Sequence, residues 1–214
     1  MKKIEEITIN NPLINTITPI GLEFRRNNVI IGENLGRIYG VVKYPQEVEM
    51  GWLSKVSNMP GTIVAQTFTP IDAGEFIDAI SKNISQNRGV ANSSRDPLTQ
   101  QRAEKGAEDG ERIMKEIDQN GETVGKMGVL IMPLSKEDDT FTKLCRRVES
   151  SFAGIRCKIR CMANLQQQAF KTLAPYHVPD EDISNITERI VPLKSFIGGF
   201  PFAAQGYSDN AGYF

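Results

Sequence analysis

Between residues 123 and 161 the sequence contains an apolar strand, an amphipathic helix and an alternating strand in direct succession. Residues 129–132 read Val-Leu-Ile-Met, apolar on both faces, which predicts the centre of a buried strand over 123–132. A helix beginning at Asp138 or Asp139 and ending at Gly154 carries one apolar stripe: Phe141, Leu144, Cys145, Val148 and Phe152. The strand 155–161 then alternates Ile155, Cys157, Ile159 and Cys161 with three cations. These patterns restrict the chain to a sheet on which helices pack.

The N-terminal part of the sequence predicts an extended arm followed by a β-meander. Residues 1–19 alternate Asn, Thr and Ile around Pro12 and Pro19, which is typical of an extended segment. We expect strands at 22–26 and 29–31 around an Asn27-Asn28 turn. A further strand over 37–44 ends at Pro45, because proline cannot donate to a ladder. A short helix over 50–56 follows.

The middle of the chain predicts a strand at 62–68 and then two helices. Asp72 begins the first helix as its N-cap, with Glu75 reaching back, and apolar residues recur at helical spacing as far as Ile84. Residues 85–95 are polar and predict a loop. Asp96-Pro97 then opens a very polar second helix that ends at Asn120-Gly121, and we expect it to be a surface excursion.

The predicted fold class is α+β, with a mixed, largely antiparallel sheet and helices mainly on one face. Residues 62–161 predict a ferredoxin-like βαβ core with an extra helix, preceded by the meander. A helix over 165–173 stops at Pro175, and an acidic loop is expected over 176–190. We therefore divide the chain into an extended arm (1–19), a single α+β domain (20–190) and a Gly/Pro/aromatic linker (191–214).

Composition narrows the range of function classes. The 214 residues carry a formal net charge of −1, so overall charge predicts neither a nucleic-acid nor a membrane partner. No apolar run approaches the roughly 18 residues that a membrane span needs, and acids stand where a signal peptide would be apolar. Three cysteines are too few for a disulfide framework and predict free thiols. These features together indicate a cytoplasmic chain.

Three motifs suggest chemistry but favour a structural interpretation. Gly121 to Met127 resembles a phosphate-binding loop, yet the first glycine is replaced by Asn120 and the hydroxyl residue by Met127. Cys157 and Cys161 share a predicted strand face with isoleucines, which favours buried thiols over a metal site. His177, the single histidine, has no companion nucleophile at a recognisable spacing, so we expect a loop histidine. The sequence predicts no catalytic residue, no metal ligand and no cofactor-binding residue.

A group of five cations is the first candidate interaction site. Arg156, Lys158 and Arg160 share one face of the predicted strand, and Arg146 and Arg147 lie on the preceding helix. They could form a local positive patch on an otherwise neutral chain. The alternative is a solvated sheet face with acids paired across strands. If the patch is functional, its partner could be nucleic acid, an acidic protein or anionic lipid.

The C-terminal stretch is the second candidate site. Residues 191–214 are dense in glycine, proline and aromatics, and we expect them to form a hinge and an interdomain interface. The aromatic residues assigned to this interface are Phe200, Phe202, Tyr207, Tyr213 and Phe214. The sequence ends on an apolar run, Tyr213-Phe214, and we therefore expect a larger domain to follow it.

Several short motifs in the same order resemble one known family. They are Tyr44-Pro45, Gly51-Trp52-Leu53, Pro60, Pro70-x-Asp72, Ala107-Glu108-Asp109, the run Gln167 to Pro175, Phe200-Pro201-Phe202 and Asp209-x-x-Gly212-Tyr213. This arrangement resembles the N-terminal domain of conjugative-transfer ATPases of type IV secretion systems (the CagE/TrbE/VirB group), and looks most similar to the branch from Gram-positive conjugative elements. The resemblance covers nearly the whole chain as an order of elements.

The resemblance implies a non-catalytic docking and assembly domain for conjugal DNA transfer. Its implied partners are the protein's own C-terminal ATPase domain and inner-membrane proteins of the conjugation channel, with homo-oligomers expected only in the full-length protein. ATP and Mg²⁺ are expected only in that missing ATPase domain, and the full-length protein is expected to lie peripherally at the inner face of the cell membrane. Two alternatives remain: a nucleic-acid-binding domain that uses the basic strand face, and a small independent enzyme of unknown reaction.

Overall fold

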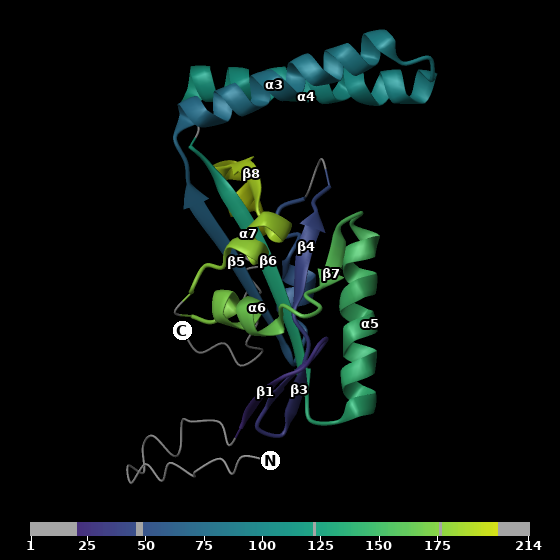
Figure 1. The fold of residues 1–214 in the computed structure, drawn as a ribbon, viewed down its shortest axis with the longest axis vertical. Helices are drawn as coiled ribbons and strands as arrows, with labels where there is room; N and C mark the ends of the chain where they lie inside the picture. Colours follow the sequence, from purple (N-terminus) through teal and green to yellow (C-terminus); the bar gives the residue numbers. More distant parts are fainter. Residues whose placement is uncertain (1–20, 46–48, 122, 176, 201–214) are drawn as a thin grey trace, which may run out of the picture.

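An eight-stranded antiparallel sheet organises the described part of the chain (Figure 1). The computed structural model describes residues 21–45, 49–121, 123–175 and 177–200. The α+β fold class predicted from the sequence is confirmed. In chain order the elements are β1 (Leu22–Phe24), β2 (Val29–Ile31), β3 (Asn34–Gly36), β4 (Tyr39–Lys43), α2 (Ser54–Ser57), β5 (Thr62–Pro70), α3 (Ala73–Ser93), α4 (Pro97–Asn120), β6 (Val124–Ser135), α5 (Asp138–Gly154), β7 (Lys158–Cys161), α6 (Gln166–Leu173), α7 (Glu181–Thr187), β8 (Arg189–Pro192) and α8 (Leu193–Gly199).

The central strand is β6, which is apolar on both faces as its sequence predicts. One of its edges pairs with β5 from Thr62↔Pro133 to Pro70↔Gly125. Its other edge pairs in succession with β8, β4 and β3. Val129 and Ile131 pack on one face of the sheet, whereas Leu130 and Met132 pack on the other. Because β6 is buried on both faces, residues 129–132 are apolar without alternation, which is the pattern that the sequence shows.

Helices cover both faces of the sheet, so the expectation that they lie mainly on one face is wrong. The first face packs against α2 and α5 through a core that includes Val56, Val148 and Phe152. The second face packs against α6 and α7 through Ala169 and Ile183. The error arose because helices α6 and α7 are short and follow the last strand of the predicted core.

Two split βαβ units give the sheet a ferredoxin-like topology. The strand order is β5-β6-β4-β7, and every neighbouring pair in it is antiparallel. Strands β4 and β5 are therefore parallel, with β6 between them and α2 connecting them. Strands β6 and β7 are likewise parallel, with β4 between them and α5 connecting them. The ferredoxin-like core begins at β4 rather than at residue 62, because the helices that follow β5 do not cross the sheet.

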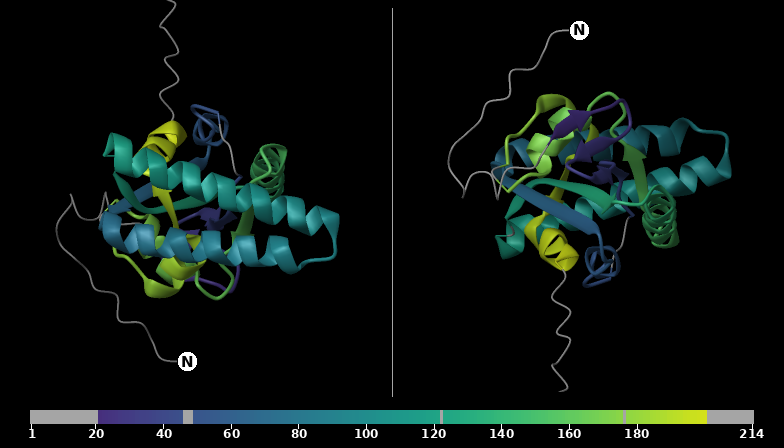
Figure 2. Two further views of the ribbon diagram at one scale, coloured as in Figure 1. Left: turned by 90° about the horizontal axis from the view of Figure 1, so that it is seen from above. Right: turned by 90° about the horizontal axis from the view of Figure 1, so that it is seen from below.

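Those helices, α3 and α4, form an antiparallel hairpin inserted between β5 and β6 (Figures 1 and 2). The hairpin lies across one end of the sheet. The loop predicted at 85–95 is wrong, because α3 continues to Ser93. Close packing explains the extra turns: a Cβ on Gly106 would lie 2.9 Å from the Asn87 side chain, and Ala91 and Ala103 are buried. Small residues on α4 thus allow the polar half of α3 to pack as a helix.

Local capping signals define the ends of the hairpin helices. The Asp72 side chain accepts a hydrogen bond from the Gly74 backbone N–H at 2.6 Å, which confirms it as an N-cap. Asp96 accepts from the N–H groups of Leu98 and Thr99, with Pro97 at the first helical position. Gly121 ends α4 in the left-handed region at φ 60°. For α5 the N-cap is Glu137, one residue before the predicted cap at Asp138 or Asp139.

The segment predicted as an acidic loop and a linker is partly regular structure. Helix α7 begins at the N-cap Asp180, and β8 pairs with β6 from Arg189↔Met127 to Pro192↔Val124. Helix α8 follows at once, and the Phe196 ring packs against Phe68 with centroids 4.9 Å apart. Residues 191–200 therefore belong to the folded body, which is the part of the described chain outside the α3–α4 hairpin. The predicted arm at 1–19 and the rest of the predicted linker, 201–214, lie outside the described residues.

Candidate functional site

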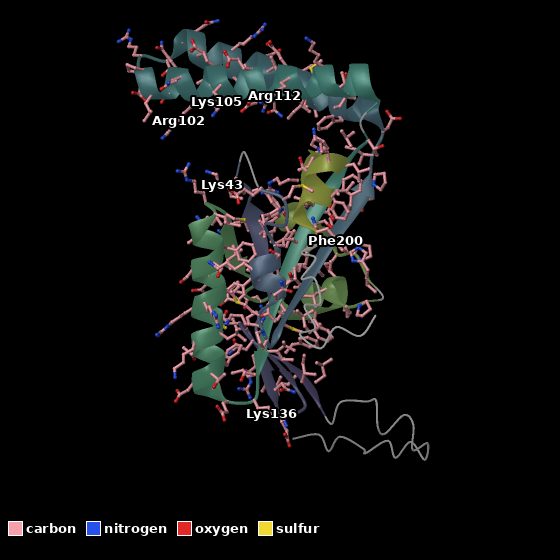
Figure 3. The ribbon with its side chains drawn as sticks, turned by 180° about the vertical axis from the view of Figure 1, so that it is seen from behind. Lys43, Arg102, Lys105, Arg112, Lys136 and Phe200 are labelled. Carbon is pink, nitrogen blue, oxygen red and sulfur yellow. The ribbon has the colours of Figure 1, made fainter. Side chains whose placement is uncertain are left out.

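A cleft of about 1250 Å³ lies between the α3–α4 hairpin and the body (Figure 3). Arg102 and Lys105 line it from α4, on the side of the hairpin that faces the body. The opposite wall carries Lys43 from the end of β4 and Arg156 from the turn between α5 and β7. Lys55 from α2 also lines it. We call this space, with Lys43, Lys55, Arg102, Lys105 and Arg156, the basic cleft.

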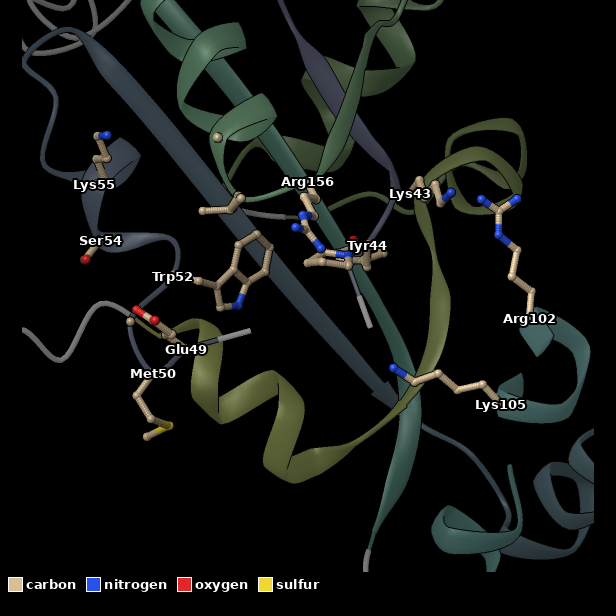
Figure 4. Close-up of a pocket in the computed structure, with 14 residues that line it drawn as sticks. Lys43, Tyr44, Glu49, Met50, Trp52, Ser54, Lys55, Arg102, Lys105 and Arg156 are labelled. Atoms are coloured by element: carbon tan, nitrogen blue, oxygen red, sulfur yellow. The ribbon is translucent and has the colours of Figure 1, made fainter. Parts of the chain in front are cut away.

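Two aromatic side chains, Tyr44 and Trp52, lie on the body side of the cleft (Figure 4). Tyr44 and Trp52 meet edge to face with centroids 6.2 Å apart, and Trp52 meets Phe152 in the same way at 6.4 Å. Trp52 is only 8% exposed, so it belongs to the core more than to the open surface. The Tyr44 hydroxyl donates to the Thr187 carbonyl, and burial raises the pKa of this phenol. The aromatics therefore connect the body wall of the cleft to the hydrophobic core.

Among the described residues that line the cleft, cations outnumber acids. The acidic residue among those that line it is Glu49. The five cations are all exposed, and none of them forms an ion pair with a residue in the described part of the chain. The pKa of the Asp96 carboxyl group is lowered chiefly by its hydrogen bonds to Thr99. The charge of Arg102 lowers it more weakly, without a direct contact. An excess of unpaired positive charge on facing walls can bind a ligand with several negative charges.

The structure divides the basic patch predicted from the sequence. Arg156 has φ 58° in the turn before β7 and lines the cleft, so it does not belong to the strand face. Lys158 and Arg160 remain exposed neighbours on one face of β7. Ile159 and Cys161 pack toward α5, so Lys158 and Arg160 point to the opposite face of the sheet. Arg146 and Arg147 are exposed on α5 itself.

Four residues of the basic cleft were missed by the sequence reasoning. Lys43, Lys55, Arg102 and Lys105 come from three separate elements, and nothing local in the sequence joins them. One partial signal existed, because residues three apart on a helix share a face and Arg102 and Lys105 are so spaced. Which side of α4 faces the body depends on the hairpin packing, which the sequence does not reveal.

Two of the three cysteines are buried, and the histidine lies in a loop, as the sequence predicts. Cys145 and Cys157 are buried, Cys161 is partly buried, and burial raises the pKa of the Cys157 thiol to about 12. His177 is an exposed residue at φ 38° whose Nδ1 lies 2.9 Å from the Thr172 carbonyl oxygen. Within the described ranges no cluster of His, Cys, Asp or Glu side chains is suited to hold a metal ion.

The remaining motifs are located as follows. Gly125 and Lys126, from the segment that resembles a phosphate-binding loop, lie within strand β6. Phe200 is 47% exposed and lines a second cavity of about 390 Å³ beside β5 and the end of α6. Of the aromatics assigned to an interdomain interface, Phe202, Tyr207, Tyr213 and Phe214 lie outside the described residues.

No protein-family model matches the chain, and no curated protein matches its sequence. In the portion of the chain that the structure describes, the helices are too short or too polar to cross a membrane.

Proposed function

We propose that this chain is a non-catalytic docking and assembly domain of a conjugative-transfer ATPase of the type IV secretion class. In this proposal it connects its own C-terminal ATPase domain to inner-membrane proteins of the conjugation channel. The full-length protein acts as an oligomer at the cytoplasmic face of the membrane, and ATP and Mg²⁺ bind only to the ATPase domain. The order of motifs from Tyr44-Pro45 to the Gln167–Pro175 segment supports this assignment.

The projecting α3–α4 hairpin is the observation that carries the proposal. The hairpin is inserted between the adjacent strands β5 and β6. It presents two long helices with polar outer surfaces. Its own apolar residues, Phe76, Ile80, Ile84 and Ile117 among them, pack between its helices and near its base. A rigid arm of this kind is suited to reach a partner without altering the sheet that supports it.

The strands on either side of the hairpin can be joined by a short turn, which makes the proposal testable. Because Pro70 pairs with Gly125 and the Ile71 N–H donates to the Val124 carbonyl, an Asn-Gly turn can join Ile71 directly to Val124. We expect this hairpin-less variant to fold, as judged by circular dichroism. We expect it to lose co-purification with the inner-membrane channel proteins encoded by the same mobile element. Undiminished co-purification would contradict the proposed role of the hairpin.

Two further measurements test the assignment to the ATPase family. Calorimetric titration of the chain with Mg-ATP should give no saturable heat, because Gly125 and Lys126 belong to a paired strand and cannot wrap a phosphate. Micromolar binding would contradict a non-catalytic domain. The reading frame beyond the codon for Phe214 should encode Gly-x-x-x-x-Gly-Lys-Ser/Thr, and a stop codon there would remove the family assignment.

A further inference from the structure

We propose that the basic cleft binds the phosphodiester backbone of a single nucleic-acid strand. This inference goes beyond the proposed docking function and does not depend on it. Of the cations predicted from the sequence, only Arg156 belongs to this site.

Cations line both walls of the cleft. Arg102 and Lys105 descend from α4, while Lys43 rises from the end of β4 on the body. Figure 4 shows Lys43 and Arg102 directed toward one another. Arg156 lies beside Tyr44 on the body wall, and Lys55 lines the far side of the same space, beyond Trp52. A ligand in the cleft would therefore meet positive charge from two sides.

The contrast with neighbouring cations on the hairpin shows that this charge is not neutralised locally. Arg88 forms an ion pair with Glu111, and Arg112 forms one with Asp109 at 3.1 Å. Within the described ranges Arg102 and Lys105, on the same hairpin, have no such partner. Like charges that converge with too few counter-charges repel one another, and a polyanion relieves that repulsion while releasing condensed counterions.

Size and shape favour a nucleic-acid strand over other anions. The cleft volume of about 1250 Å³ exceeds the roughly 300–1,000 Å³ typical of small-molecule sites. A flat anionic membrane cannot reach cations that line the facing walls of a cleft. An acidic peptide would find little aromatic surface in the cleft, because Trp52 is buried; the exposed apolar side chain of Met50 also lines it, so the competition test includes an acidic polypeptide. A nucleic-acid strand carries one negative charge per nucleotide, and guanidinium groups bind phosphate in a bidentate manner.

The test measures binding of a fluorescein-labelled 20-nucleotide oligothymidylate to the 214-residue chain by anisotropy. With five phosphate contacts and a salt slope of about −0.7 per contact, affinity should fall roughly 100-fold between 50 and 200 mM salt. The variant Arg102→Ala/Lys105→Ala should bind at least about tenfold more weakly, and its salt dependence should shrink to about 20-fold. Both positions are exposed on a helix, so alanine should not disturb folding.

Two control variants remove the same charge elsewhere. Arg146→Ala/Arg147→Ala changes the outer side of α5, and Lys158→Ala/Arg160→Ala changes the strand face favoured by the sequence. Both should bind as the wild type does. Loss of binding only in the β7 variant would place the site on that strand face and overturn the proposal. Equal loss in all three variants would show that nucleic acid is attracted by overall charge alone, which also overturns it.

Competition separates nucleic acid from the other polyanions. Unlabelled oligothymidylate should displace the probe, whereas polyglutamate or phosphatidylserine vesicles at equal charge concentration should not. Displacement by either of those competitors overturns the assignment to nucleic acid. Absence of probe binding to the wild-type chain at 50 mM salt overturns the proposal altogether.

Discussion

Gln166 is a buried side chain on which two strands depend. It is 1% exposed, and its Oε1 accepts a hydrogen bond from the Ile38 N–H at 2.9 Å. Its Nε2 donates to the Ile38 carbonyl at 3.2 Å and to the Met162 carbonyl at 2.9 Å. The side chain thus ties the residue before β4 to the residue after β7, at the edge of the ferredoxin-like core.

Gln166→Met should destabilise the fold by about 2–3 kcal/mol. Both carbonyls keep a second partner, since the Met162 N–H donates to Ile38 and the Leu165 N–H donates to Met162. The Ile38 N–H alone is left without an acceptor, which costs about 1–3 kcal/mol, and two further hydrogen bonds of about 0.5–1.5 kcal/mol each are lost. The added apolar burial of methionine offsets about 1–2 kcal/mol of this.

Equilibrium unfolding in guanidinium chloride measures this difference, with Gln167→Met at an exposed position of the same helix as the matched control. The thermal midpoint of Gln166→Met should fall by about 5–10 °C, because 1 kcal/mol shifts a domain of this size by roughly 2–4 °C. A change below about 0.5 kcal/mol, the range usual for surface substitutions, would refute the argument.

The pH dependence of stability in the variant Gln166→Glu gives a second test of these hydrogen bonds. Its carboxylate can still accept from the Ile38 N–H, but its second oxygen faces the two carbonyls to which Nε2 donated. This repulsion and burial raise the pKa of the introduced carboxyl group in the folded state above its unfolded value of about 4.3. Relative to wild type, the variant should therefore be least destabilised below about pH 4.3 and lose stability as the pH rises. Equal destabilisation at pH 4 and pH 7 would contradict the hydrogen-bond assignment.

The other stability predictions concern two glycines and one cysteine. A Cβ on Gly125 would lie 2.6 Å from the Thr69 carbonyl oxygen, so Gly125→Ala should destabilise by about 1–3 kcal/mol. Gly89 is exposed in α3 with open space around it, so Gly89→Ala should instead stabilise the fold by about 0.5–1 kcal/mol. Denaturant titration measures both variants, and the opposite sign at either glycine would contradict the packing described. Burial raises the pKa of the Cys157 thiol from 9.0 to about 12. The stability that the neutral, buried thiol contributes is therefore complete below pH 9 and is lost as the pH rises from 9 to 12. Cys157→Val should flatten that alkaline loss by up to about 1.4 kcal/mol per pH unit, and an unchanged slope would show that this thiol ionises in the folded state.

Sequence patterns predicted those elements whose signals are local. The apolar centre of β6, the stripe on α5 and the Asp96-Pro97 start of α4 are each contained in one stretch of sequence, and each was confirmed. The Asp180 cap of α7 was also a local signal, yet it was missed because the surrounding acidic residues suggested a loop. Elements of this kind can be found without knowledge of the fold.

Elements that depend on distant partners could not be predicted. The second half of α3 is helical because Ala103 and Gly106, well separated in sequence, leave room for it. Of three consecutive glutamines in α6, only the position of Ile38 and Met162 identifies Gln166 as the buried one. The basic cleft shows the same limit, since its cations come from β4, α2, α4 and a turn.

The position of the α3–α4 hairpin has a consequence for how the chain folds. Strands β5 and β6 form the longest ladder of the sheet, yet the whole hairpin separates them in sequence. Helical hairpins form from local contacts within microseconds, whereas closing a long disordered loop carries an entropic cost. Once α3 and α4 have paired, Pro70 and Gly125 are already side by side, and the ladder can zip from that end. We therefore expect the same insertion that we propose as an arm for partners to form first and to start the pairing of β5 with β6.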